Sequence, residues 1–206
     1  MPIVEDLNLL IKTRVIIWEI NESISELSSS IVLSKASLKI LEQKKSEIHK
    51  KQFLAVRNIL KYISIDQKKL NYDDFGNPSI GESKISITHS GFYVAIILSA
   101  SDVGIDIEKI NDKVLKIKSK FLETELNYPK KLTTVSALVY WNIKESIYKA
   151  IGKKGIDFKK NILVLPLDMK KNKVKSWYID DDKIYSFDTR FKISKKYTLA
   201  FVIKNY

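Results

Sequence analysis

Two short segments carry acidic side chains at spacings that could hold a metal ion. Asp106 and Glu108 alternate with isoleucines, so in a strand both carboxylates point to the same side. Farther along, helical spacing places Trp141, Glu145 and Lys149 on one stripe of a helix. Three carboxylates with lysines at the rim suit a hard divalent cation, Mg2+ or its substitute Mn2+, that leaves positions open for phosphate oxygens. These residues point to phosphate chemistry.

Ordinary structural roles compete for the same residues. An acidic pair on an exposed strand can serve solubility or protect a sheet edge, and Glu145 with Lys149 can form a surface ion pair. However, the stretch 93–107 is almost uninterrupted apolar sequence, which predicts that Asp106 and Glu108 end a buried strand. Like charges so close repel each other unless a cation bridges them. We therefore favour metal binding by Asp106 and Glu108, while Glu145 and Lys149, taken alone, would fit a surface ion pair.

The composition describes a soluble globular protein. The chain has 206 residues, 45% of them apolar, which is enough for one sizeable core or two small ones. It has no cysteine, which excludes disulfides, thiolate metal sites and cysteine nucleophiles and fits a reducing compartment. The N-terminus lacks a basic leader, and no apolar run approaches the length of a bilayer span. We expect a cytoplasmic protein without membrane contact.

The net charge limits the choice of partner. A formal charge of +12 favours anionic partners, among them nucleic acid, acidic proteins and phosphorylated cofactors. A basic nucleic-acid-binding module is one reading, but it lacks a recognition motif and leaves the clustered carboxylates unexplained. The chain also has no P-loop, no G-x-G-x-x-G and no zinc-ligand spacing, so nucleotide hydrolysis and Rossmann-type oxidoreduction find no support.

The pattern of apolar and turn residues predicts mixed secondary structure. Helical spacing covers residues 30–63, roughly 113–126, and a longer helix capped by Thr133 or Thr134 that ends at Gly152. A Gly, Asn, Asp and Pro cluster makes 71–83 a loop. Strands are expected at residues 11–20, 85–87, 93–98, 103–107, 162–165, 174–179, 183–188 and 197–203. The order of strand, helix and strand thus occurs twice, on either side of about Ser101.

Four motifs in order resemble one enzyme family. They are H-K-K-Q-F-L-A-V-R at 49–57, G-N-P at 76–78, I-S-I-T-H-S-G at 85–91, and G-I-D-I-E at 104–108 followed by W-N-I-K-E-S-I-Y-K at 141–149. Together they are similar to the signature of the 4'-phosphopantetheinyl transferases, in the larger single-chain class that activates peptide, polyketide and fatty-acid synthases. The similarity runs from about Ile48 to Gly155.

The resemblance implies a fold and an activity. The fold is α+β, with two similar halves (residues 1–100 and 101–206) related by a pseudo-two-fold, the cofactor in a cleft between them and the metal site in the second half. The activity is transfer of 4'-phosphopantetheine from coenzyme A to a serine of an acidic acyl or peptidyl carrier protein, which releases 3',5'-ADP. The implied protein is a monomer that does not act on nucleic acid.

The resemblance also implies roles for the residues of the second half. Asp106, Glu108 and Glu145 would hold Mg2+, with Glu145 as the candidate base, directly or through metal-bound water. Lys149 would hold the pyrophosphate and stabilise the departing charge. Lys144 would do the same or simply support its helix face.

The first half would bind the adenosine end of coenzyme A. His89 would contact the 3'-phosphate, with further contacts from Thr88, Arg57 and Lys51, while His49 is expected to be a surface residue. An arginine can grip phosphate with two bonds, which makes Arg57 a better candidate than Lys51.

Two positions depart from the family pattern. Ser86 stands where asparagine is common, and Asn77 replaces a lysine whose charge would lie near the adenosine phosphates. These departures motivate an alternative, in which the chain is an inactive family member that acts as a binding protein.

Overall fold

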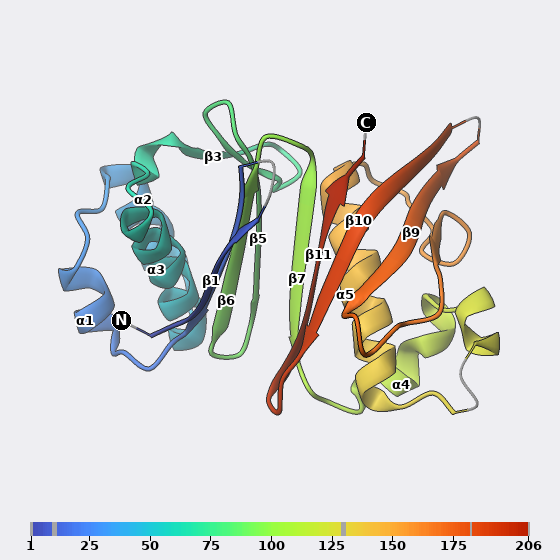
Figure 1. The fold of residues 1–206 in the computed structure, drawn as a ribbon. Helices are drawn as coiled ribbons and strands as arrows, with labels where there is room; N and C mark the ends of the chain where they lie inside the picture. The colour runs from blue at the N-terminus through green and yellow to red at the C-terminus, as the bar shows by residue number, and fades with distance from the viewer. Residues whose placement is uncertain (1, 10–11, 129–130, 182, 206) are drawn as a thin grey trace. The chain divides into compact units, whose positions relative to one another are not determined.

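The protein folds as two compact units of mixed α and β structure. The computed structural model describes residues 2–9, 12–128, 131–181 and 183–205, and its contacts divide the chain into Met1–Ala100 and Ser101–Tyr206, hereafter unit 1 and unit 2. Each unit contains an antiparallel sheet with one long helix against a face (Figure 1). The expectation of an α+β architecture is confirmed at this level.

Unit 1 is a four-stranded sheet with three helices. Its strand order is β1-β2-β6-β5, and all neighbours are antiparallel. These strands are β1 (Ile3–Leu9), β2 (Thr13–Glu19), β5 (Lys84–Ser90) and β6 (Tyr93–Ser99). The helices are α1 (Ile24–Ser29), α2 (Lys35–Gln43) and α3 (Glu47–Tyr62), and a turn η1 (Gln67–Lys69) precedes a small hairpin of β3 (Leu70–Tyr72) and β4 (Pro78–Ile80).

The core of unit 1 lies between α3 and the sheet. The helix turns Leu54, Ile59 and Leu60 inward, and alternate residues of β2 and β6, such as Ile16 and Ile96, meet them. All five of these side chains are fully buried, which removes apolar surface from water and fixes the helix over the strands.

Unit 2 is a five-stranded sheet with order β7-β11-β10-β9-β8, again antiparallel throughout. The strands are β7 (Val103–Lys109), β8 (Ile162–Val164), β9 (Lys173–Asp180), β10 (Lys183–Ile193) and β11 (Tyr197–Lys204). The helices are α4 (Lys113–Ile117) and α5 (Thr134–Ile151), with single turns η2 (Lys118–Lys120) and η3 (Thr124–Asn127). Helix α5 packs its buried Ile143 and Ile147 against the sheet, mainly over β7 and β11.

Local sequence fixes both ends of α5. The Thr133 hydroxyl accepts from the backbone of Ser136, whose own side chain bonds back to Thr133, so the helix begins with a reciprocal capping box. It ends at Gly152, which has φ 67° and ψ 15°, a left-handed conformation that glycine adopts without strain. Both ends match the sequence-based prediction.

Three strands in each unit share one order of connections. In unit 1, α3 lies between β2 and the consecutive strands β5 and β6 in the chain, and β6 pairs with β2. In unit 2, α5 lies between β7 and the consecutive strands β10 and β11, and β11 pairs with β7. The first strand of each trio therefore pairs with the last.

Some predicted elements differ from the observed ones. The helix expected at about 113–126 is α4 followed by two 3-10 turns, of which the second carries the buried Glu125. The helical spacing of 30–63 fits one or two helices, and the structure has two, α2 and α3. By contrast, β1 was not expected, and the loop predicted at 71–83 contains β4 and the end of β3. Among the described residues, no helix is long and apolar enough to cross a membrane.

Candidate functional sites

The carboxylates of unit 2 lie where β7 passes under α5. Asp106 is 5% exposed and Glu108 is half-buried, two residues apart on the face of β7 that α5 covers. Glu145 projects from α5 and is also half-buried. The alternation of β7 and the stripe of α5 thus bring the predicted acidic residues to one place within the unit.

Helix α5 holds both oxygens of Asp106. The Lys149 ammonium lies 2.7 Å from Oδ1, and the Asn142 side-chain amide donates to Oδ2 over 2.8 Å. Thr198 of β11 in turn donates to Oδ1 of Asn142 over 2.6 Å, which fixes which way the amide points. Lys149 also donates to the carbonyl of Ile105. Asn142 is therefore a supporting residue that the sequence analysis missed, although it lies within the W-N-I-K-E motif.

A glycine allows this close approach. A Cβ placed on Gly104 would lie 1.8 Å from the carbonyl oxygen of Ser146. This oxygen belongs to the backbone of α5, so the clash could be relieved only by a shift of the helix or of the strand. Ser146 ties the same region to β11, because its hydroxyl donates to the carbonyl of Ala200 over 3.0 Å. The glycine of G-I-D-I-E thus lets α5 come near enough to hold Asp106.

The environment of Glu145 favours a proton or a cation. Burial, together with the charges of Asp106 and Glu108, raises the pKa of Glu145 to about 7, while Lys149 works in the opposite direction. Within the described part of the chain, no group of three His, Cys, Asp or Glu side chains is gathered closely enough to hold a metal ion. The three carboxylates are thus near enough to repel one another without forming a ready-made ligand cluster.

Oxygen donors of this kind fit a hard divalent cation. A positive charge would relieve the repulsion that raises the pKa of Glu145, and Lys149 already supplies one such charge at Asp106. Asp106, Glu108 and Glu145 are therefore suitable in type and charge to bind Mg2+.

An apolar cavity lies beside Glu108. It has a volume of about 280 Å³, and Glu108, Lys109 and Lys113 line it together with Val114, Ile117, Leu138, Trp141 and Asn111. Trp141 packs edge-on against Phe121, with ring centroids 5.0 Å apart, and tilted against Phe158 at 5.8 Å. Trp141 is thus held in the core of unit 2 and forms one wall of the cavity.

Lys144 does not take the place predicted for a catalytic lysine. Its side chain is 0% exposed, and its ammonium pairs with Glu125 at 2.7 Å and donates to the carbonyls of Phe158 and Ile162. Burial lowers the pKa of Lys144, while Glu125 raises it. This corrects the prediction that Lys144 contacts the pyrophosphate, because its ammonium is fully enclosed by protein. The alternative, that it supports the helix, agrees with this placement.

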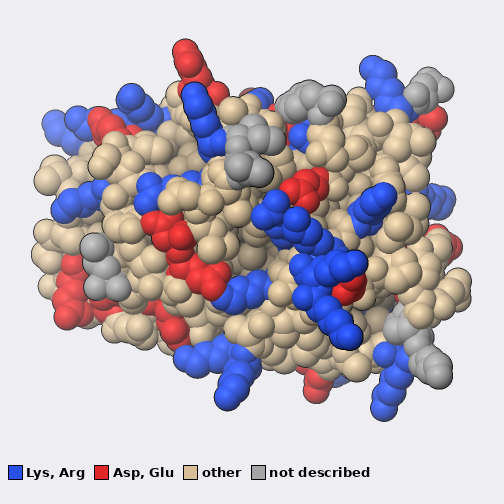
Figure 2. Space-filling model, in the orientation of Figure 1, with Lys and Arg blue, Asp and Glu red and all other residues tan. Residues whose placement is uncertain are grey.

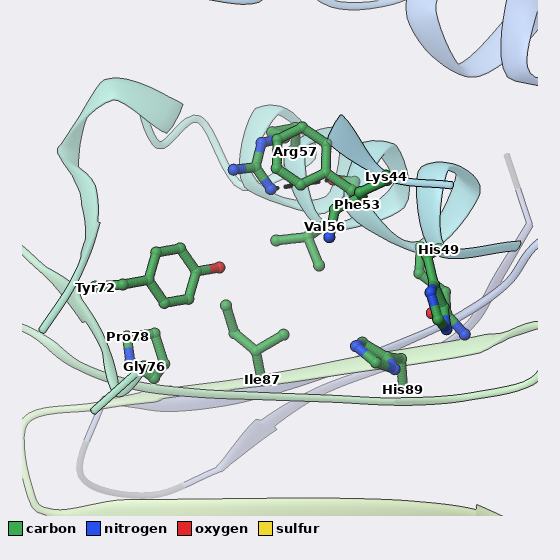
Figure 3. Close-up of a pocket in the computed structure, with 11 residues that line it drawn as sticks. Lys44, His49, Phe53, Val56, Arg57, Tyr72, Gly76, Pro78, Ile87 and His89 are labelled. Atoms are coloured by element: carbon green, nitrogen blue, oxygen red, sulfur yellow. Dashed lines mark hydrogen bonds between the residues drawn. The ribbon is translucent and has the colours of Figure 1, made fainter. Parts of the chain in front are cut away.

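A second cavity lies in unit 1 between α3 and the sheet. It has a volume of about 350 Å³, and Figure 3 shows that side chains of α3 and of β5 face it from opposite sides. His49, Gln52, Phe53, Val56 and Arg57 come from α3, and Ile87 and His89 from β5. Its remaining walls are Lys44, Tyr72, Gly76 and Pro78.

Arg57 is a buried cation at this cavity. It is 5% exposed, its guanidinium stacks 3.3 Å from the centre of the Phe53 ring, and Nη1 donates to the carbonyl of Phe53. Its Nε is buried without a hydrogen-bond partner, as is Oε1 of Gln52, whose amide donates to Gly91. Burial lowers the pKa of Arg57 to about 10. An anion in the cavity would stabilise this charge and satisfy Nε.

The predicted residues of unit 1 divide between the cavity and other places. His89 and Arg57 line it. Thr88 does not, because alternation along β5 turns it to the opposite face of the sheet, where it is buried. Lys51 forms an ion pair with Glu47 at 3.1 Å. Neither is among the described residues that line the cavity, and their contacts with the cofactor stay predictions.

Some lining residues were not predicted. His49 was expected to be a surface residue; it is exposed, but it also borders the cavity. Its spacing of three, four and seven residues from Gln52, Phe53 and Val56 was the signal that could have shown this. Asn77 does not replace the missing lysine, because it closes the loop by hydrogen bonds to Asp73. Lys44 supplies a cation at the cavity instead.

Comparisons with known proteins agree with the motifs. Residues 102–202 match the family model of the 4'-phosphopantetheinyl transferase superfamily. A stretch of 110 residues is 31% identical to the 4'-phosphopantetheinyl transferase gsp of Aneurinibacillus migulanus, and it covers 50% of this chain and 46% of that protein. The match therefore spans about half the length of this relative.

Proposed function

Because the chain belongs to the 4'-phosphopantetheinyl transferase superfamily, we propose that it transfers 4'-phosphopantetheine from coenzyme A to a carrier-protein serine and releases 3',5'-ADP. The observation that carries this proposal is the arrangement at β7 and α5, where Asp106, Glu145 and Lys149 of the two family motifs meet. Phosphoryl transfer depends chiefly on positioning and charge neutralisation, and this arrangement offers both.

We assign the residues of unit 2 as follows. Asp106, Glu108 and Glu145 would hold Mg2+, which when bound would neutralise pyrophosphate oxygens and polarise the phosphorus that is attacked. Lys149 would bind a phosphate oxygen and stabilise charge on the leaving group. With a pKa of about 7, Glu145 is suited to accept the serine proton near neutral pH. The apolar cavity beside Glu108 is suited to the pantetheine chain.

The cavity of unit 1 would bind the adenosine end of coenzyme A. Its buried Arg57 and its two histidines, His49 and His89, favour a phosphate, and the Phe53 and Tyr72 rings favour a flat base. The pseudo-two-fold arrangement of halves and the cleft that the family resemblance implies are part of this proposal.

The partner would be an acidic carrier protein. Lys and Arg side chains gather over the β9 and β10 region of unit 2 (Figure 2), where the outward positions include Lys173, Lys175, Lys192 and Arg190, the last paired with Asp188. Such a surface attracts an anionic partner and speeds its encounter. We further propose that the protein acts as a monomer in the cytoplasm.

Mass spectrometry tests the proposal directly. An apo carrier protein is incubated with this chain, coenzyme A and Mg2+, and its serine should gain the mass of phosphopantetheine. A carrier with that serine changed to alanine, and a reaction with EDTA, serve as controls and should show no gain. An unmodified carrier together with retained binding of coenzyme A would favour the inactive binding protein, whereas tight, salt-sensitive binding to DNA would favour the nucleic-acid module.

A further inference from the structure

A fully buried ion pair lies directly behind the candidate site of unit 2. Lys144 is 0% exposed and Glu125 is 1% exposed, and Nζ lies 2.7 Å from Oε1. The same ammonium donates to the carbonyls of Phe158 and Ile162, each over 2.8 Å. Three N–H donors thus meet three acceptors, and the lysine has no surface left with which to contact a substrate.

Glu125 extends these contacts to other segments. Its Oε1 also accepts from the backbone N–H of Val164 over 3.3 Å, and its Oε2 accepts from that of Glu123 over 3.2 Å. The pair therefore joins α5 to η3, to the segment before β8, and to β8 itself. Three stretches of unit 2, at residues 123–125, 144 and 158–164, are therefore joined by this ion pair.

The position of the pair determines how α5 is rotated. Successive residues of an α-helix point about 100° apart, so Lys144 and its neighbour Glu145 face different sides. On the side of β7, Asn142 and Lys149 fasten α5 to Asp106; on the other side, Lys144 fastens it to Glu125. With both sides held, the helix cannot turn about its axis without breaking buried charged contacts.

We propose that Lys144 and Glu125 are a positioning pair, which holds α5 in the rotation at which Glu145 and Lys149 face β7. This inference rests on the proposed function, since it assigns the motif lysine to orientation of the site and not to contact with the pyrophosphate. A buried ion pair rarely adds stability over apolar residues of similar size, but removal of one partner leaves a buried charge uncompensated. A role in geometry explains why the site contains such a pair.

Three variants test the proposal. K144M removes the ammonium and keeps the volume, E125Q removes the carboxylate charge and keeps an acceptor for Val164, and E125Q/K144M removes both charges. We expect K144M to lower kcat at least tenfold, with a smaller, roughly threefold, rise in KM for coenzyme A. The double variant should recover at least fivefold of that loss. If Lys144 touched the substrate, the double variant would stay as inactive as K144M, and the proposal would be overturned.

E125Q provides an independent test if K144M does not fold. This variant keeps Lys144 and changes only its enclosed partner. If Lys144 contacted the substrate directly, the kcat of E125Q should be nearly normal, whereas a positioning role predicts that it falls at least threefold. T189V is the matched control, because it removes a buried hydrogen bond between Ser176 and Thr189 in the same unit. It should lower the melting temperature without lowering kcat at temperatures where it is folded.

The positioning pair can also be tested if the proposed transferase activity is wrong. If the wild-type chain never modifies a carrier, Mg2+-dependent binding of coenzyme A is measured by calorimetry instead. K144M should then weaken binding at least threefold and E125Q/K144M should restore it. Equal affinities in all variants would overturn the positioning pair, whatever the reaction proves to be.

Discussion

The ammonium of Lys149 lies 2.7 Å from Oδ1 of Asp106, so the last turn of α5 is joined by a charged contact to the middle of β7. A divalent cation that bound Asp106 would therefore meet a carboxylate that already has a lysine as its partner. On the proposed function, Lys149 would exchange this partner for a phosphate oxygen of the substrate.

Glu145→Gln should abolish most of the transfer while the fold persists. The change removes the charge of a proposed metal ligand and candidate base from a half-buried position and leaves no cavity. We expect a loss of about a hundredfold or more in kcat. Carrier modification followed by mass spectrometry measures this, with the exposed Glu82→Gln as the control. A fall of less than tenfold would remove Glu145 from the site.

The stability of the metal-free protein should depend on the protonation of Glu145. Its pKa is raised from 4.5 to about 7 in the folded state, so between these values the folded chain holds a proton that the unfolded chain releases. The free energy of unfolding should consequently fall as pH rises through this range, by at most about 3 kcal/mol, and level off above pH 7. Urea titrations in EDTA should show this decline in the wild type and not in Glu145→Gln; parallel curves would contradict it.

His89→Ala should separate coenzyme A from dephospho-coenzyme A. If the imidazole contacts the 3'-phosphate, its loss removes a charge-assisted hydrogen bond worth roughly 1.5–3 kcal/mol, which only coenzyme A can make. Calorimetry with both ligands gives the comparison. Equal losses for the two would show that His89 borders the cavity without binding that phosphate.

Arg57→Met should weaken ligand binding without weakening the fold. Burial lowers the pKa of Arg57 to about 10, which means that the folded protein carries this charge at a cost when the cavity holds no anion. We expect at least a tenfold loss in affinity for coenzyme A and no decrease in the melting temperature. Lys45→Met, at an exposed position in the link between α2 and α3, is the control. A strongly destabilised Arg57→Met would instead indicate a structural role through Phe53.

Gly104→Ala should disrupt the contact between β7 and α5. The new methyl group would lie 1.8 Å from the carbonyl oxygen of Ser146, so the helix or the strand must shift. Overpacking of this kind costs about 1–3 kcal/mol or more, and a shift would also separate Asp106 from Lys149. Chemical denaturation and the transfer assay should both show the loss. Normal stability with normal activity would mean that the two elements can move apart freely.

Much of the site is visible in the sequence because it depends on local periodicity. Alternation along β7 puts Asp106 and Glu108 on one face, and helical spacing puts Glu145 and Lys149 on one stripe, whatever the rest of the chain does. The ends of α5 are equally local, since a capping threonine and a left-handed glycine define them. These features could be predicted because each needs only a few neighbouring residues.

The remaining features depend on contacts between distant residues. Lys144 is adjacent to Glu145 in sequence, yet the packing of η3 and β8 against α5 places its ammonium beside Glu125 and away from the candidate site. Thr88 is adjacent to His89, but the position of the sheet relative to α3 determines which of the two borders the cavity. Periodicity tells which residues share a face. Only packing determines which face meets a helix, a cavity or solvent, because burial depends on neighbours that are far away in the chain.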